Sequence, residues 1–143
     1  MADRRPYRQI VERLQGAGLR PTRQRMALAR LLFDGDHRHV TAEQLHGEVQ
    51  AARRSVSLAT VYNTLNQFTR AGLLREVVVE AGRSYFDTNV SDHCHFYHED
   101  KGRLMDIDGA SIRIEGLPKP PEGASISRVD VVIRVSESGE PDA

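Results

Sequence analysis

The order of the hydrophobic patterns constrains the fold of this chain most, because helical segments come first and strand-like segments follow. Apolar residues recur at helical spacing in four stretches: Tyr7 to Leu14, Met26 to Phe33, Leu45 to Val49 and Leu58 to Phe68. Residues that commonly cap helix N-termini precede the last three stretches: Thr22, Thr41 and Ser57. Thr41 and Gln44 also have the spacing of a capping box. These patterns predict four helices.

After Gly72 the pattern changes from helix to strand. Residues 74–79 are rich in β-forming side chains, residues 80–83 have a turn sequence, and residues 84–87 can return as a second strand. Short helices followed by a hairpin are the order of elements in a winged helix. We therefore predict an α+β protein in which residues 1–88 form an N-terminal winged helix-turn-helix domain that binds DNA.

Residues 89–143 have the patterns of a second, small α/β domain. We expect short strands around the turn at Lys101 and Gly102, a short helix near 108–115, and a Pro-rich connection over 117–123. Val129, Val131, Ile133 and Val135 then alternate with polar residues, which predicts a half-buried antiparallel strand suited to a dimer interface. From about residue 136 the tail has a disordered composition.

Charge divides the chain in the same way, although the formal net charge is zero. Residues 1–75 contain 13 arginines and no lysine against 6 acidic residues, whereas residues 76–143 contain 7 basic against 14 acidic residues. A basic half indicates a polyanionic partner. The alternative is an ordinary soluble protein with uneven surface charge.

The sequence also bounds the compartment. No stretch approaches the roughly 20 apolar residues of a membrane span. The charged N-terminus, Met1 to Tyr7, lacks the apolar segment of a secretory signal. Cys94 is the only cysteine, which excludes an internal disulfide and a structural four-cysteine zinc site. We expect a cytoplasmic protein with no membrane partner.

The fourth helical segment has the side chains of a DNA-reading helix. With Leu58, Val61 and Leu65 turned to the core, small, hydroxyl and amide side chains form the outer face: Ala59, Thr60, Tyr62, Asn63 and Asn66. Such side chains suit base edges, thymine methyls and phosphates in a major groove. Arginines that could contact phosphates lie in nearby segments: Arg20, Arg23, Arg25, Arg53, Arg54, Arg70, Arg75 and Arg83. A solvated polar face is the alternative; the hairpin and the basic half favour DNA.

A candidate metal site follows the hairpin. His93 and His95 flank Cys94, and residues two apart share one face of a strand. Three further residues complete the candidate site: His39, Asp87 and Asp106. Imidazole with carboxylate suits Fe(II), Mn(II) or Zn(II). The alternative for any one histidine is a hydrogen-bonded surface side chain, which we favour for His37 and His46.

A second group of potential ligands lies on or near the other face of the same segment: Asp92, Cys94, His98 and Glu99. This group is a candidate second metal site or haem site, because His or Cys ligation of haem is chemically reasonable. Three roles stay open for Cys94: a ligand, a redox-sensitive thiol or a buried small residue.

Taken together, these motifs resemble the ferric uptake regulator (Fur) family from about residue 17 to 135. The similar segments are Ala17-Gly18-Leu19-Arg20 with Thr22 and Arg25, His39 to Glu43, Ser57 to Tyr62, Phe86-Asp87, and Asp92-His93 with His95. The resemblance implies a winged helix joined to a dimerisation domain, in a homodimer that binds palindromic operators and is switched by metal. By position it implies a regulatory site of His39, Asp87, His93, His95 and Asp106. It also implies DNA contacts by Arg20, Thr60 and Tyr62, with Asn63 at a position where other members often have Arg.

Within the family the chain looks most like the iron response regulator branch. The similar segments are Gly116 to Gly123 and Ser127 to Val132. That branch also lacks paired CxxC motifs, and His98 and Lys101 stand where the first pair would fall. The branch implies a haem-responsive repressor of iron and haem homeostasis genes. It typically has three consecutive histidines, whereas Cys94 is the middle residue here, and its Cys-Pro haem motif is absent.

Asp87 supports a second hypothesis for the function, because an aspartate at this position resembles the peroxide-sensing members of the family. In those members bound Fe(II) reacts with peroxide and a ligating histidine is oxidised. They usually retain the four-cysteine zinc site that this chain lacks.

Two other classes of protein remain as alternatives. A metal-dependent hydrolase would need an open coordination position and a base, but five candidate ligands leave little room, and no nucleophile or phosphate-binding motif is present. We therefore expect no enzymatic activity. A DNA-binding architectural protein with purely structural histidines would contain no stoichiometric metal.

Overall fold

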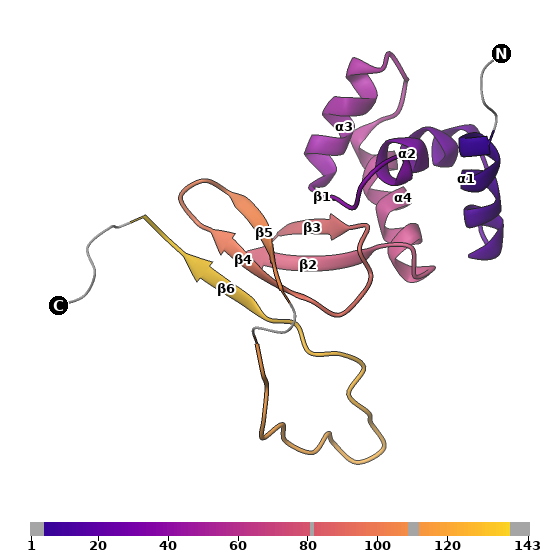
Figure 1. Ribbon diagram of the computed structural model, residues 1–143. Helices are drawn as coiled ribbons and strands as arrows, with labels where there is room; N and C mark the ends of the chain where they lie inside the picture. Colours follow the sequence, from indigo (N-terminus) through magenta and orange to yellow (C-terminus); the bar gives the residue numbers. More distant parts are fainter. Residues whose placement is uncertain (1–4, 81, 109–111, 138–143) are drawn as a thin grey trace. The chain divides into compact units, whose positions relative to one another are not determined.

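The chain divides into two compact units, residues 1–90 and 91–143. The structure is a computed structural model that describes residues 5–80, 82–108 and 112–137. Its division falls two residues beyond the domain boundary expected from the sequence. In the described part of each unit, three strands form one sheet (Figure 1).

Helices make up most of the first unit, as predicted: α1 (Arg5–Gly16), α2 (Arg23–Phe33), α3 (Ala42–Ala51) and α4 (Leu58–Arg70). The three expected caps are in place. Thr22 Oγ1 accepts from the Arg25 amide and Ser57 Oγ from the Thr60 amide. Thr41 and Gln44 form both bonds of the capping box. Each cap stabilises its helix by about 1 kcal/mol. None of the described helices combines the length and apolarity needed to cross a membrane.

The helices bury one shared hydrophobic core. Its largest fully buried side chains include Leu14, Leu28, Leu32, Leu45, Leu65 and Phe68. Leu45, Leu65 and Phe68 belong to the predicted inward faces. Tyr7 begins the apolar residues that recur at helical spacing, but it is 53% exposed and is not part of this core. The helix begins only two residues earlier, and among its described side chains Ile10 is the first that is buried in the core.

The sheet of the first unit contains the predicted hairpin and one unexpected strand. β2 (Arg75–Glu80) and β3 (Arg83–Asp87) are antiparallel, and the positive φ of Gly82, 75°, serves the turn between them. β1 (His39–Val40) pairs with the other edge of β3, so the strand order is β1-β3-β2. β1 was not foreseen from the sequence, because two residues are too short a run to show an alternating pattern.

The sheet of the second unit has β4 (Cys94–His98) at its centre. The predicted neighbour β5 (Arg103–Ile107) pairs with it antiparallel across the turn at Lys101. β6 (Val132–Val135) lies on its other side and is parallel to it, so the expectation of an antiparallel last strand was wrong. β5 and the long connection of residues 108–131 together join β4 to β6, and they supply the crossover of a dozen or more residues that parallel neighbours require.

Residues 112–131 of that connection form neither helix nor strand. The helix expected near 108–115 is absent from its described residues, and residues 109–111 lie outside the described part. The irregular backbone is explained by Pro118, Pro120 and Pro121, because proline lacks the backbone N–H that donates hydrogen bonds in helices and strands. Of the expected disordered tail, residues 138–143 lie outside the described residues.

The core of the first unit gives a test of the fold. Leu45 is fully buried, so Leu45→Ala should lower the free energy of unfolding of this unit by about 2–5 kcal/mol. Val78 is 62% exposed on β2, and Val78→Ala should change it by less than about 0.5 kcal/mol. Urea unfolding followed by the helical circular dichroism signal measures both. Equal effects of the two substitutions would contradict the described core.

Candidate metal centre and DNA-facing residues

The pairing of β4 with β5 brings a histidine and an aspartate together. His95 is the Cα partner of Asp106 in this antiparallel ladder. The His95 side chain is only 3% exposed, and its Nε2 lies 3.2 Å from Asp106 Oδ1. Asp106 is half-exposed, which keeps its charge partly hydrated. The register of two adjacent strands therefore sets two of the candidate ligands.

His93 lies one residue before β4 and turns to the same side as His95. Its Nε2 is 3.5 Å from the same oxygen, Asp106 Oδ1, and the two imidazole rings are 4.4 Å apart. His93 Nδ1 lies 2.6 Å from the carbonyl oxygen of Ser91. Because a carbonyl oxygen can only accept, Nδ1 donates this bond, and in the neutral ring the lone pair is then on Nε2. Such a hydrogen bond is what orients metal-binding histidines.

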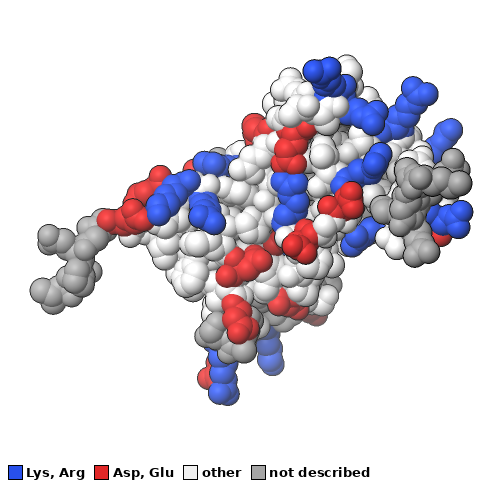
Figure 2. Space-filling model, turned by 45° about the horizontal axis from the view of Figure 1, so that its top comes forward, with Lys and Arg blue, Asp and Glu red and all other residues white. Residues whose placement is uncertain are grey.

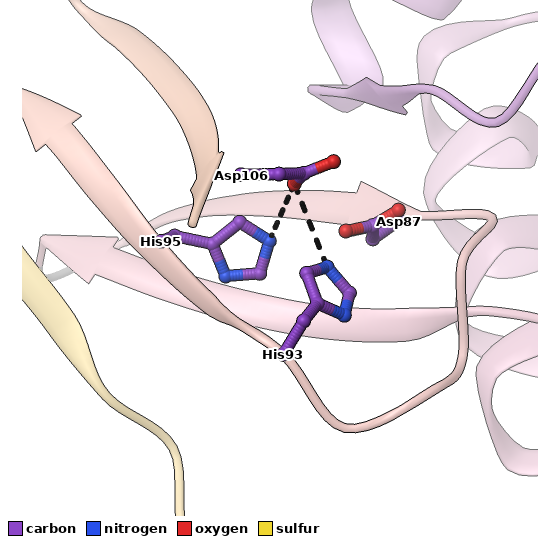
Figure 3. A group of neighbouring side chains, drawn as sticks. All are labelled: Asp87, His93, His95 and Asp106. Carbon is purple, nitrogen blue, oxygen red and sulfur yellow. Dashed lines mark ion pairs between the residues drawn. The ribbon is translucent and has the colours of Figure 1, made fainter. Parts of the chain in front are cut away.

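Asp87, the last residue of β3, is the fourth member of the group. One ligand atom from each of Asp87, His93, His95 and Asp106 lies within 4.8 Å of the others (Figure 3). Asp87 is 1% exposed, and its Oδ1 accepts a hydrogen bond from the Asn89 amide at 2.9 Å. The backbone around it is fixed by Thr88, whose amide donates to the Arg38 carbonyl.

The donor set fits a divalent cation. Two imidazole nitrogens and two carboxylate oxygens converge, and a cation would stabilise the Asp87 carboxylate, which burial would otherwise penalise. Nitrogen and oxygen donors suit Fe(II), Mn(II) and Zn(II), whereas a thiolate-rich set would favour zinc or copper(I). The side chains present therefore suit the metals expected from the sequence.

His39 is the sequence-predicted ligand that lies outside this group. It is the Cα partner of Asp87, so the strand pairing brings the two backbones together. Its ring stands edge-on to Tyr85 at 6.0 Å. His37, expected to be a hydrogen-bonded surface residue, is exposed, with Nδ1 3.3 Å from the Thr88 hydroxyl.

The structure does not bring the second candidate group together. Cys94 and His98 stand at opposite ends of β4, about 13 Å apart at roughly 3.3 Å per residue. His98 Nε2 instead lies 3.4 Å from Glu137, and its Nδ1 accepts from the Lys101 amide. Asp92 and Glu99 are exposed beyond the two ends of the strand. Cys94 is a half-buried free thiol.

The side chains predicted to form the outer face of α4 are exposed or partly exposed. Ala59, Tyr62 and Asn63 are exposed, and Thr60 is partly exposed. Val61 and Leu65 are fully buried, so the helix divides as its sequence pattern indicates. The Ser57 hydroxyl caps the helix and also donates to Thr60 Oγ1 at 3.0 Å, so it orders the first turn.

The arginines predicted to contact phosphates differ in exposure and in their hydrogen bonds within the protein. Arg25 donates to Gln67 Oε1 on α4 at 3.0 and 3.3 Å, and to the Arg20 carbonyl at 2.9 Å. Its guanidinium therefore braces α2 against α4 and holds the backbone at Arg20. Arg20 and Arg83 are exposed, Arg83 at the start of β3 in the wing. Figure 2 shows Lys and Arg side chains gathered over the helices of the first unit.

One surface contact was not foreseen from the sequence. The Tyr62 hydroxyl donates to Glu43 Oε1 at 2.5 Å, joining α4 to the first turn of α3. The residues are 19 positions apart, and no local pattern links them. The capping box at Thr41 indicated only that Glu43 would lie in the first turn of a helix.

Known proteins resemble this chain in sequence. A peroxide-responsive repressor, PerR, of Staphylococcus aureus is 34% identical over 94 residues, which cover 66% of this chain and 63% of that protein. The chain thus matches less than two thirds of the length of this relative.

Solved structures resemble it over a larger part of its length. The ferric uptake regulator of Pseudomonas aeruginosa with manganese is 26% identical, with a TM-score of 0.67 over 89% of this chain and 96% of that one. The Vibrio cholerae ferric uptake regulator, 22% identical, has a TM-score of 0.69 over 88% and 98% and supports the fold alone. The profile described as the Ferric uptake regulator family matches residues 16–132. This chain belongs to the ferric uptake regulator family.

Proposed function

We propose that this protein is a metal-responsive transcriptional repressor that binds operator DNA as a homodimer. The observation that carries the proposal is the convergence of Asp87, His93, His95 and Asp106 within 4.8 Å. The same chain has a helix whose exposed face is suited to a major groove. A metal site together with a DNA-reading helix supports regulation by metal.

The positions of the four ligands suggest how metal binding would affect DNA binding. Asp87 and His93 are separated only by residues 88–92, so a cation that binds both closes a short loop in the chain. Closing it removes conformational freedom from the connection between the wing hairpin and β4. In a dimer, this restraint would limit how the two α4 helices are presented to half-sites at matched helical phase.

A homodimer is supported by apolar side chains that the second unit leaves exposed. Ile114, Leu117, Ile126, Val129 and Ile133 are each between 38% and 52% exposed. Only a few of the described residues of this unit are buried apolar side chains: Tyr97, Leu104 and Ile107. A second copy of the chain would cover such a surface and complete the burial.

The first candidate for the role of this repressor is the one predicted from the sequence, a regulator of iron and haem homeostasis genes with Fe(II) or Mn(II) at the metal site. A peroxide sensor is the second candidate. It is supported by the Asp87 carboxylate in the ligand group and by the peroxide-responsive relatives of Staphylococcus aureus. Fe(II) held by these residues would supply one electron that cleaves the O–O bond of peroxide, and His93 and His95 would be the side chains that the resulting oxygen species oxidises.

One experiment separates these identities. A duplex is selected from a random library by the Mn(II)-loaded protein and is then titrated with the apo, Mn(II), anaerobic Fe(II) and haem-treated forms. Tight binding that haem releases supports the iron and haem regulator. Binding that peroxide abolishes only in the Fe(II) form, with one oxygen atom added to His93 or His95, supports the peroxide sensor. If no duplex is enriched, the proposal of a DNA-binding regulator is wrong.

His93 gives a direct test of the metal site. His93→Ala should lower Mn(II) affinity at least about 100-fold, since loss of even an outer-shell partner of a metal site costs 10- to 100-fold. Far-ultraviolet circular dichroism should stay unchanged, because His93 lies outside every helix.

His46→Ala is the matched control for that substitution, because His46 lies on α3 outside the ligand group and should keep wild-type affinity. Isothermal titration calorimetry measures both variants. A His93→Ala protein that binds Mn(II) like the wild type would show that the ligands are assigned wrongly.

Tyr62 tests the DNA-reading helix. Tyr62→Ala should weaken binding to the selected duplex about tenfold or more, which is the usual range for losing one base contact, and should leave the metal content unchanged. Tyr7→Ala removes another exposed tyrosine of the same unit and should leave affinity within about twofold. Fluorescence anisotropy measures the affinities, and equal effects of the two substitutions would count against α4 as the reading helix.

A further inference from the structure

The bond between Tyr62 and Glu43 lies at the surface and not in the core. Tyr62 is 37% exposed and Glu43 is exposed, yet the hydroxyl and the carboxylate are 2.5 Å apart. A surface pair of this kind contributes little to stability. The main effect of this bond is therefore on what the Tyr62 hydroxyl can offer to DNA.

The start of α3 fixes the backbone from which Glu43 reaches Tyr62. The capping box of Thr41 and Gln44 fixes the first turn of α3, where a negative charge is favoured by the helix dipole. Tyr62, Glu43 and Arg83 line one hollow together with Thr41, Gln44, Gly82 and Ser84. Glu43 thus shares this hollow with Tyr62 of the reading helix and with the wing arginine.

The protonation states fix the direction of the bond. The hydrogen bond from Tyr62, a backbone hydrogen bond and the charge of Arg83 lower the pKa of Glu43 below its usual 4.5. The hydrogen bond to Glu43 raises the pKa of Tyr62 above its usual 10.0. At neutral pH the carboxylate is ionised and can only accept, so the phenol must be the donor.

This direction restricts what Tyr62 can bind. Phosphate oxygens only accept hydrogen bonds. While the Tyr62 hydroxyl donates its one hydrogen bond to Glu43, it cannot also donate to the DNA backbone. The phenol oxygen can still accept from the amino group of adenine or cytosine, and the ring can pack on a thymine methyl. We propose, resting on the proposed function, that Glu43 is a specificity-determining positioning residue that makes Tyr62 read bases instead of phosphates.

A plain electrostatic effect of Glu43 has to be separated from this role. Its negative charge repels phosphates, so removing the charge should strengthen binding to any DNA sequence. The positioning role acts only through the Tyr62 hydroxyl. It therefore changes the ratio of affinities for the selected duplex and for a scrambled duplex of equal length, and it disappears in Tyr62→Phe.

The first test needs no DNA. Full-length protein with ¹³C-labelled tyrosine rings is titrated by NMR, and the Tyr62 signal is identified by its loss in Tyr62→Phe. The titration midpoint of Tyr62 should fall in Glu43→Ala. An unchanged midpoint would overturn the inference while leaving the proposed function untouched.

The second test measures discrimination between the two duplexes. Glu43→Ala should lower the affinity ratio about tenfold, a typical loss for one base contact. In the Tyr62→Phe background the same substitution should leave the ratio unchanged. Glu12→Ala removes an exposed carboxylate of α1 and should keep the wild-type ratio.

Two results would contradict this account. A ratio that survives Glu43→Ala, or that falls equally with and without the Tyr62 hydroxyl, would refute the role of Glu43. If the wild-type protein prefers neither duplex, the proposed DNA-binding function itself fails. Circular dichroism confirms that each variant is folded before its ratio is compared.

Discussion

The central strand β3 is the constraint on which both functional regions depend. Its pairing with β2 forms the wing, and its pairing with β1 sets His39 opposite Asp87. Phe86 anchors it in the core of the first unit, while the next residue, Asp87, belongs to the candidate metal group. Because adjacent residues of a strand point to opposite sides, one strand can serve packing and ligation at successive positions.

Local chemistry made much of the first unit predictable. The caps at Thr22, Thr41 and Ser57 act within three residues of sequence, so short motifs specify them. The His93 and His95 pair was predictable for a similar reason, since the period of a strand sets it. Asp106 could be added to the predicted metal site because the turn at Lys101 fixes the register of β5 on β4.

Features that depend on distant pairing were not predictable. β6 was expected to be antiparallel, because its alternating residues reveal a strand but not the direction of its neighbour. The hydrogen bonds of the Arg25 guanidinium to Gln67, 42 positions away, were not foreseen either. The bond from Tyr62 to Glu43 is of the same kind. Sequence patterns report burial and local geometry, whereas these contacts depend on how helices are packed together.

We propose that metal binding and DNA binding are coupled in this protein. Such coupling is reciprocal, so the factor by which metal changes DNA affinity must equal the factor by which DNA changes metal affinity. The most direct test is the Mn(II) affinity of the wild-type protein, measured with and without a saturating amount of the selected duplex. The account predicts affinities that differ by about 5- to 150-fold, the usual range of such couplings. Equal Mn(II) affinities in the two states would contradict it.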